Sequence, residues 1–301
     1  METSATRSRT VGVLQAVGAY GWWGFVTAIF YDDLIGIDAI DLVAWRVITA
    51  MPLVLLLVVI NRSWSEFVET LRDWNRMRWL VLSAGLILIN WFAFIWAVNT
   101  ERLVHASLGY YLNPLVAVAL SALVLKERLH PVQWLSVGTA TIGVTILSCM
   151  IGLPWISVVL ACSFPLYGLI RKQCPSSATV GLAVEMLLLL PLMVVLTTWH
   201  AYVGRSGFQT GTGVQMLLLP LSGVVTMVPL LGFAAAARRL RLSTVGMLQY
   251  IAPTGQLLTA VVFFGESMER VWWITFAFVW IAILLFSSDS FLRSRIRNRT
   301  D

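Results

Sequence analysis

The stretch DLVAWRVITAMPLVLLLVVI, residues 41–60, decides the fold class of this chain. It is apolar almost throughout, and Arg46 is the one basic residue in it. A helix of roughly 20 such residues crosses a hydrocarbon core about 30 Å thick. The apolar residues form a continuous run, whereas a strand of a membrane barrel would alternate apolar and polar residues. The stretch therefore predicts a transmembrane helix.

The composition of the whole chain extends this interpretation. Of the 301 residues, 58% are hydrophobic and 12% are charged, and the mean hydropathy is +0.82. That charged share is about half of what a soluble domain carries, so the composition excludes a soluble globular protein, and it equally excludes a disordered one. The net charge of +6 is typical of basic cytoplasmic loops and gives no reason to expect a nucleic-acid partner. We expect a multi-pass protein surrounded by membrane lipids.

Ten apolar runs are long enough to span a bilayer as helices. They are residues 11–30, 41–60, 79–98, 103–125, 132–151, 153–171, 180–199, 214–237, 242–264 and 271–291. The connections between them are short, which leaves no room for a soluble catalytic domain.

The basic residues orient these spans. Seventeen of the 21 lysines and arginines fall on the two tails and on alternate loops, whereas the other loops carry three and one lies inside a span. Basic residues accumulate on the cytoplasmic side of membrane proteins. The sequence therefore predicts that both termini, the tails 1–10 and 292–301, are cytoplasmic.

An internal repeat appears when the chain is shifted by 139 residues. The matched pairs are Tyr111 and Tyr250, Pro114 and Pro253, and Glu127 and Glu266. The halves, residues 11–151 and 153–291, contain five spans each, and an odd number places the second half upside down. Inverted repeats are found in many secondary transporters, with the substrate site between the halves. Chance similarity between apolar helices is the alternative.

Two charged residues lie about six residues inside predicted spans, where a charge is costly unless it meets a partner or water. Arg46 and Glu185 are 139 residues apart and therefore occupy matched positions. We expect them to flank one central cavity, Arg46 nearer the outside and Glu185 nearer the cytoplasm, about 12 Å apart in depth. The alternatives are snorkelling of Arg46 to lipid headgroups and a structural hydrogen bond for Glu185. If protons drive the protein, Glu185 is the candidate carrier, because a buried carboxyl can load and release a proton.

A second set of polar and aromatic residues lies beside two prolines that interrupt helical hydrogen bonding. Interrupted helices often line transporter sites. The candidate pathway residues in this set are Asn90, Trp91, Tyr111, Asn113, Gln249 and Tyr250. Trp23 and Tyr167, matched at a shift of 144, would add aromatic walls for an amphipathic solute. Ordinary bonding and packing between helices is the alternative for each.

Other function classes find less support. The three cysteines form no metal-ligand spacing, the three histidines are scattered over loops, and no phosphate-binding motif for ATP is present. We expect no cofactor, no metal and no enzymatic activity. A non-transporting membrane enzyme, or a channel or scaffold, remains the alternative.

Four stretches resemble the EamA-type permeases of the drug/metabolite transporter superfamily, and within it the RarD group. They are FIWAVN at 94–99, ASLGYYLNPLV at 106–116, YGLIRK at 167–172 and RLRLSTVGMLQYIAPT at 239–254. The resemblance implies a ten-helix permease of the inner (plasma) membrane built from two EamA repeats. We therefore predict a secondary transporter that moves a small metabolite or an amphipathic drug-like solute by alternating access. Protons are a candidate coupling ion, and the oligomeric state stays open.

Overall fold

The computed structural model describes residues 4–99, 103–151, 155–263, 265 and 270–300, and over these residues it contains helices and no strand. The first half comprises α1 (Ser4–Gly21), the π-helix η1 (Trp22–Val26), α2 (Thr27–Asp32), α3 (Ala39–Ile60), α4 (Trp64–Arg72), α5 (Trp74–Asn99), α6 (Leu103–Leu123) and α7 (Pro131–Ile151). The second comprises α8 (Trp155–Gln173), α9 (Ala178–Tyr202), α10 (Gly207–Thr210), α11 (Gly213–Arg239), α12 (Leu242–Leu248), α13 (Ile251–Val262) and α14 (Arg270–Thr300). The predicted all-helical membrane class is confirmed.

Eight of the described helical segments are long and apolar enough to cross a membrane. The predicted spans 103–125 and 242–264 are not among them. Within the first, the apolar part of α6 is the shorter segment Leu108–Leu123. The second is divided into α12 and α13. The described residues of the two predicted tails are helical, because α1 begins at Ser4 and α14 continues to Thr300.

Pro253 accounts for the break between α12 and α13. A proline in a helix lacks an N–H, and its ring clashes with the carbonyl four residues earlier, which here belongs to Gln249. Gln249 and Tyr250 lie between the two helices. The Gln249 carbonyl instead accepts a hydrogen bond from the amide of Ala252 at 3.1 Å. The interruption predicted at this proline is therefore present, whereas α6 continues through the matched Pro114.

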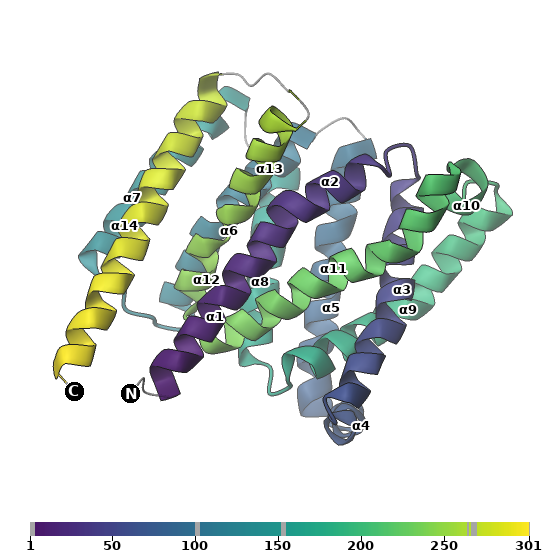
Figure 1. The fold of residues 1–301 in the computed structure, drawn as a ribbon, viewed down its shortest axis with the longest axis horizontal. Helices are drawn as coiled ribbons and strands as arrows, with labels where there is room; N and C mark the ends of the chain where they lie inside the picture. The colour runs from purple at the N-terminus through teal and green to yellow at the C-terminus, as the bar shows by residue number, and fades with distance from the viewer. Residues whose placement is uncertain (1–3, 100–102, 152–154, 264, 266–269, 301) are drawn as a thin grey trace.

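The helices pack in pairs (Figure 1). At one side α7 lies along α14, and at the other α3 packs against α9 and α11. Between them α6 packs on α8, α5 on α8, and α1 on α11. Figure 1 shows both termini and α4 at one end of the molecule, called here the terminal end, and α10 with the α2–α3 connection at the other, called the mouth end.

The outer surface carries many large apolar side chains. Leu14, Leu56, Val195, Leu217 and Leu284 are each more than half exposed. Exposure on this scale is unfavourable in water and favourable against lipid tails. It supports the placement of the helices in a bilayer.

Candidate functional site

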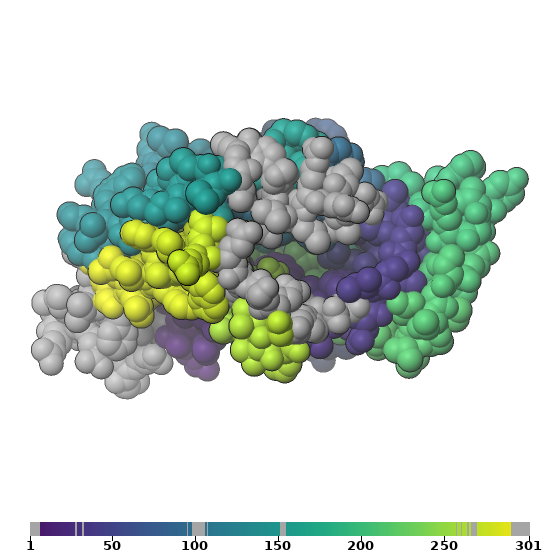
Figure 2. Space-filling view, turned by 90° about the horizontal axis from the view of Figure 1, so that it is seen from above, coloured from purple at the N-terminus to yellow at the C-terminus, as the bar shows by residue number. Residues whose placement is uncertain are grey.

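A cavity of about 500 Å³ lies between the helices, and the segment that joins α2 to α3 forms part of its wall. Figure 2, which views the mouth end, shows a hollow beside that segment. The volume falls within the range of roughly 300–1,000 Å³ that is usual for sites of small organic ligands. The wall is mainly apolar and aromatic. Its polar side chains include Arg46, Asn90, Asn113, Thr226, Gln249 and Gln256.

Arg46 is the one charged residue among the described residues of the wall. It lies in the second turn of α3. Its guanidinium carbon is 5.3 Å from the centre of the Tyr31 ring and 5.2 Å from that of Trp91, so aromatic rings cover the cation. Its Nε donates to the hydroxyl of Thr226 at 2.8 Å.

Two amides fix the helices around the cavity. Asn90 on α5 donates to Ser163 on α8 at 2.9 Å. With its amide oriented to suit its neighbours, Asn113 on α6 donates to the Leu160 carbonyl at 3.0 Å and accepts from Gln249 at 2.8 Å. Asn113 is 0% exposed, so these bonds supply the partners that a buried amide requires. They join α6, α8 and the break between α12 and α13.

An aromatic layer lies beneath the cavity; it consists of Tyr20, Trp23, Phe164, Tyr167 and Phe233. The rings of Phe164 and Phe233 are 4.9 Å apart, those of Trp23 and Phe164 are 5.7 Å apart, and those of Tyr167 and Phe233 are stacked at 5.8 Å. Tyr20, Trp23 and Phe164 also line the cavity. We call this layer the floor of the cavity; Tyr167 and Phe233 pack against its lining residues but are not part of the wall themselves.

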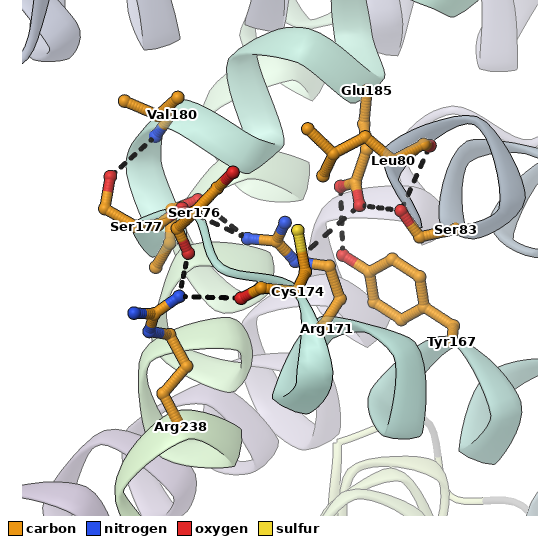
Figure 3. Close-up of polar contacts among 11 residues, drawn as sticks. Leu80, Ser83, Tyr167, Arg171, Cys174, Ser176, Ser177, Val180, Glu185 and Arg238 are labelled. Atoms are coloured by element: carbon orange, nitrogen blue, oxygen red, sulfur yellow. Dashed lines mark hydrogen bonds and ion pairs between the residues drawn. The ribbon is translucent and has the colours of Figure 1, made fainter. Parts of the chain in front are cut away.

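Glu185 lies beyond this layer in a buried polar network (Figure 3). Its carboxylate accepts from Ser83 at 2.5 Å and from the Tyr167 hydroxyl at 3.2 Å, and it pairs with Arg171 at 3.6 Å. Glu185 is 0% and Arg171 1% exposed. A buried ion pair is stable only when such extra hydrogen bonds satisfy it, and loss of one partner is costly.

The network continues to the terminal end. Arg171 donates to the carbonyl of Ala178 at 3.1 Å, at the start of α9. Arg238 on α11 donates to the carbonyls of Cys174 and Ser176 in the α8–α9 connection. Four helices, α5, α8, α9 and α11, are thereby tied together on the side of the floor away from the mouth.

Gly181 provides the space for Arg171. A Cβ at this position would overlap the guanidinium. The glycine therefore lets α8 and α9 approach closely enough for the Arg171–Glu185 pair to form.

The predicted pathway residues fall into two groups. Those in the cavity wall are Trp23, Arg46, Asn90, Trp91, Asn113 and Gln249. Those away from it are Tyr111, Tyr167, Glu185 and Tyr250. The matched residues Tyr111 and Tyr250 contact each other instead, with ring centres 6.4 Å apart in a separate apolar core. Arg46 and Glu185 form no direct pair, and the aromatic layer lies between them.

Several residues of the site were not identified from the sequence. Arg171 is one of the seventeen basic residues that were counted as setting the orientation, whereas the structure buries it beside Glu185. Tyr31 and Thr226, which hold Arg46, have no distinguishing pattern. Ser83 does have one signal, since Ser222 stands 139 residues after it.

Two more carboxylates have structural partners. Asp41, at the start of α3, is 0% exposed and accepts from Thr197 at 2.6 Å and from the Gly207 amide at 2.7 Å. Glu127 accepts from the amide of Leu242 at 2.9 Å and so caps the first turn of α12. Its predicted match, Glu266, lies outside the described residues. Over the described part of the chain, no three His, Cys, Asp or Glu residues gather closely enough to hold a metal ion.

Comparison with known proteins gives a consistent result. A profile of the EamA-like transporter family matches residues 10–149. Protein RarD of Escherichia coli K12 is 39% identical over 296 residues, which cover 98% of this chain and 99% of that protein. An uncharacterized transporter of Vibrio cholerae is 39% identical over 92% of both chains. The chloramphenicol-sensitive protein RarD of Pseudomonas aeruginosa is 34% identical over 88% of this chain and 90% of its own length. One crystal structure superposes with a TM-score of 0.70 at 18% identity, over 92% of this chain and 97% of that one, and shows similarity of fold.

Proposed function

Because the chain belongs to the EamA-like transporter family, in its RarD group, we propose that it is a secondary transporter of the bacterial inner membrane. It moves a small metabolite or amphipathic drug-like solute by alternating access and performs no covalent chemistry. The observation that carries the proposal is a cavity whose wall includes the α2–α3 segment at the mouth end and a layer of packed aromatic rings. Transporter names among its relatives support it.

The proposed topology has ten spans in two inverted halves, residues 11–151 and 153–291. The packing of the helices supports this arrangement. In an inverted repeat, a contact between two helices should recur between the two helices that match them in the other half. The contact of α5 with α8 has its counterpart in that of α11 with α1, and α6 with α8 has its counterpart in α13 with η1. The pairs α3 with α9, α6 with α12, and α7 with α14 each join matched helices.

In the proposed topology both termini are cytoplasmic, so the mouth end would face outward and this arrangement would correspond to an outward-facing state. The aromatic layer and the Glu185 network then close the cytoplasmic side. Transport requires a second state in which this side opens and the mouth closes. Such a change would separate contacts among α5, α8, α9 and α11, the helices that the network joins.

Glu185 is the proposed proton carrier. When the cytoplasmic side is closed, the Glu185 carboxylate compensates the buried positive charge of Arg171. Protonation would remove that compensation and weaken the network, and would thereby favour opening toward the cytoplasm. The Tyr167 hydroxyl, which donates to Glu185, belongs to the aromatic layer and so connects proton binding to the floor of the cavity.

Transport by the purified protein in proteoliposomes tests the proposal. Radiolabelled chloramphenicol, suggested by the name of one relative, and a panel of amino acids serve as probes. We expect at least one probe to accumulate when a pH gradient is imposed, and to exchange in counterflow without a gradient. Counterflow distinguishes a carrier from a channel, because exchange needs an alternating site. Fluxes equal to those of protein-free vesicles, in both gradient directions, would contradict the proposal.

A further inference from the structure

The surroundings of Arg46 indicate the charge of the solute, an inference that rests on the proposed transport function. A guanidinium has five N–H donors. Among the described residues, Arg46 uses one of them, its Nε, on a protein acceptor, the Thr226 hydroxyl. No carboxylate pairs with it within the described part of the chain. An unpaired charge inside a membrane protein is unfavourable and usually marks a ligand site.

The rings beside Arg46 restrict how a ligand can approach it. Tyr31 and Trp91 lie within 5.3 Å and 5.2 Å of the guanidinium carbon. Aromatic rings lower the cost of removing the guanidinium faces from water. Its edges carry the free N–H groups, and their spacing matches the two oxygens of a carboxylate. The group that fits this edge is a planar anion.

The remaining wall fits the body of an amphipathic molecule. Aromatic side chains of Trp23, Phe94, Tyr110 and Phe164 line the cavity. The described wall holds neither Asp nor Glu that would attract an amine. Asp33 and Asp38 flank the α2–α3 segment but are not wall residues, and Asp38 lies 3.3 Å from His200.

We propose that the cavity selects organic carboxylates with an aromatic body, and that Arg46 binds the carboxylate through its free N–H edge. A neutral solute such as an amide offers one carbonyl acceptor but neither the second oxygen nor the negative charge of a carboxylate. A cationic solute would add repulsion to that loss. The preference is therefore for the anion over the neutral compound and for the neutral compound over the cation.

Three indole compounds that differ in charge test this inference. Indole-3-acetate carries a carboxylate, indole-3-acetamide is its neutral analogue, and tryptamine is a cation. Binding to the full chain in lipid nanodiscs is measured by equilibrium dialysis of each radiolabelled compound. We expect indole-3-acetate to bind at least tenfold more tightly than the amide and tryptamine to bind most weakly. Equal binding of acetate and amide, preference for tryptamine, or no binding of any compound would overturn the inference.

Variants of Arg46 test whether this residue causes the preference for the carboxylate. Arg46→Gln should make the acetate and amide bind equally, whereas Arg46→Lys should keep part of the preference, since it retains charge but not the paired N–H edge. Arg205→Gln is the matched control, because Arg205 is an exposed residue of the α9–α10 connection. Preference for the acetate that persists in a folded Arg46→Gln protein would contradict the assignment.

Counterflow of the same compounds separates this inference from the transport proposal. If indole-3-acetate binds through Arg46 but does not exchange across the membrane, the charge preference holds and the transport function fails. If tryptamine exchanges and indole-3-acetate does not, the transport function holds and the charge preference fails.

Discussion

At the scale of single residues, Glu185 and Arg171 depend on each other. The substitution Glu185→Gln can keep hydrogen bonds to Ser83 and Tyr167 but leaves the Arg171 charge buried without a partner. Removing one member of a buried pair costs about 3–5 kcal/mol. We expect accumulation driven by a pH gradient to fall at least tenfold and the melting temperature to decrease, both measured on purified protein.

The double variant Glu185→Gln/Arg171→Gln provides the control for this prediction. It removes both charges, so it should recover much of the lost stability while the pH gradient still drives no accumulation. Counterflow, which needs no proton movement, should persist in the double variant. Gradient-driven accumulation at the normal level in Glu185→Gln would exclude Glu185 as the carrier.

The same residues show how far the site could be predicted. Arg46 and Glu185 were identified because a charge in an apolar run is visible in the sequence without any fold. The partner of Glu185 was not, because Arg171 ends an apolar span and has the pattern of an ordinary orienting residue. Its burial depends on the close approach of α8 and α9 at Gly181, which is a tertiary contact. The position of Tyr167 beneath the cavity likewise depends on ring packing that no spacing encodes.

At the scale of helices, the crossing of η1 and α13 is a close contact beside the cavity. A Cβ at Gly24 would lie 3.0 Å from both the Ala252 carbonyl oxygen and the Gly255 Cα. Gly24→Ala should therefore push these helices apart, at a cost of about 1–3 kcal/mol, and reduce counterflow at least fivefold.

Gly21 on the same helical segment supplies the control for Gly24. Nothing lies within 4 Å of a Cβ built at Gly21, and alanine is favoured over glycine in a helix by roughly 0.5–1 kcal/mol. Gly21→Ala should thus match or exceed the original protein in melting temperature and transport. Equal loss in both variants would mean that the substitutions act on the helix itself and not on its contact with α13.

Helix boundaries, too, could be predicted from the sequence only in part. The break before α13 was predicted from Pro253, because a proline removes a helical hydrogen bond. The matched Pro114 lies inside the continuous helix α6, so the proline alone does not decide where a helix breaks. The π-helical turn at Trp22–Val26 could not be predicted. Its residues WWGFV are compatible with an ordinary helix, and the turn lies where Gly24 meets α13. We attribute the irregular turn to that contact.

At the scale of the whole molecule, the helical membrane class followed from composition, because backbone groups in lipid need internal partners. The shape of the cavity did not follow, since it depends on how the two halves close over each other. In the state described here the wall meets the surface at the α2–α3 segment, and buried side chains fill the space behind the aromatic layer. Under the proposed transport function the chain must also adopt the opposite arrangement, and the proposed inverted repeat, which the matched helix contacts support, would supply an equivalent closure for the other side.

Orientation in the membrane can be tested with introduced cysteines. The natural Cys149, Cys162 and Cys174 are first replaced by serine. Ile35, 72% exposed at the mouth end, and Ser65, exposed on α4 at the terminal end, are then changed one at a time to cysteine. In right-side-out membrane vesicles, a membrane-impermeant maleimide should label Ile35→Cys at once and Ser65→Cys only after permeabilisation. The expectation follows from the excess of basic residues at the terminal end, which favours the cytoplasm. Labelling in the reverse order would make the structure an inward-facing state, and the Glu185 network would then close the outer side.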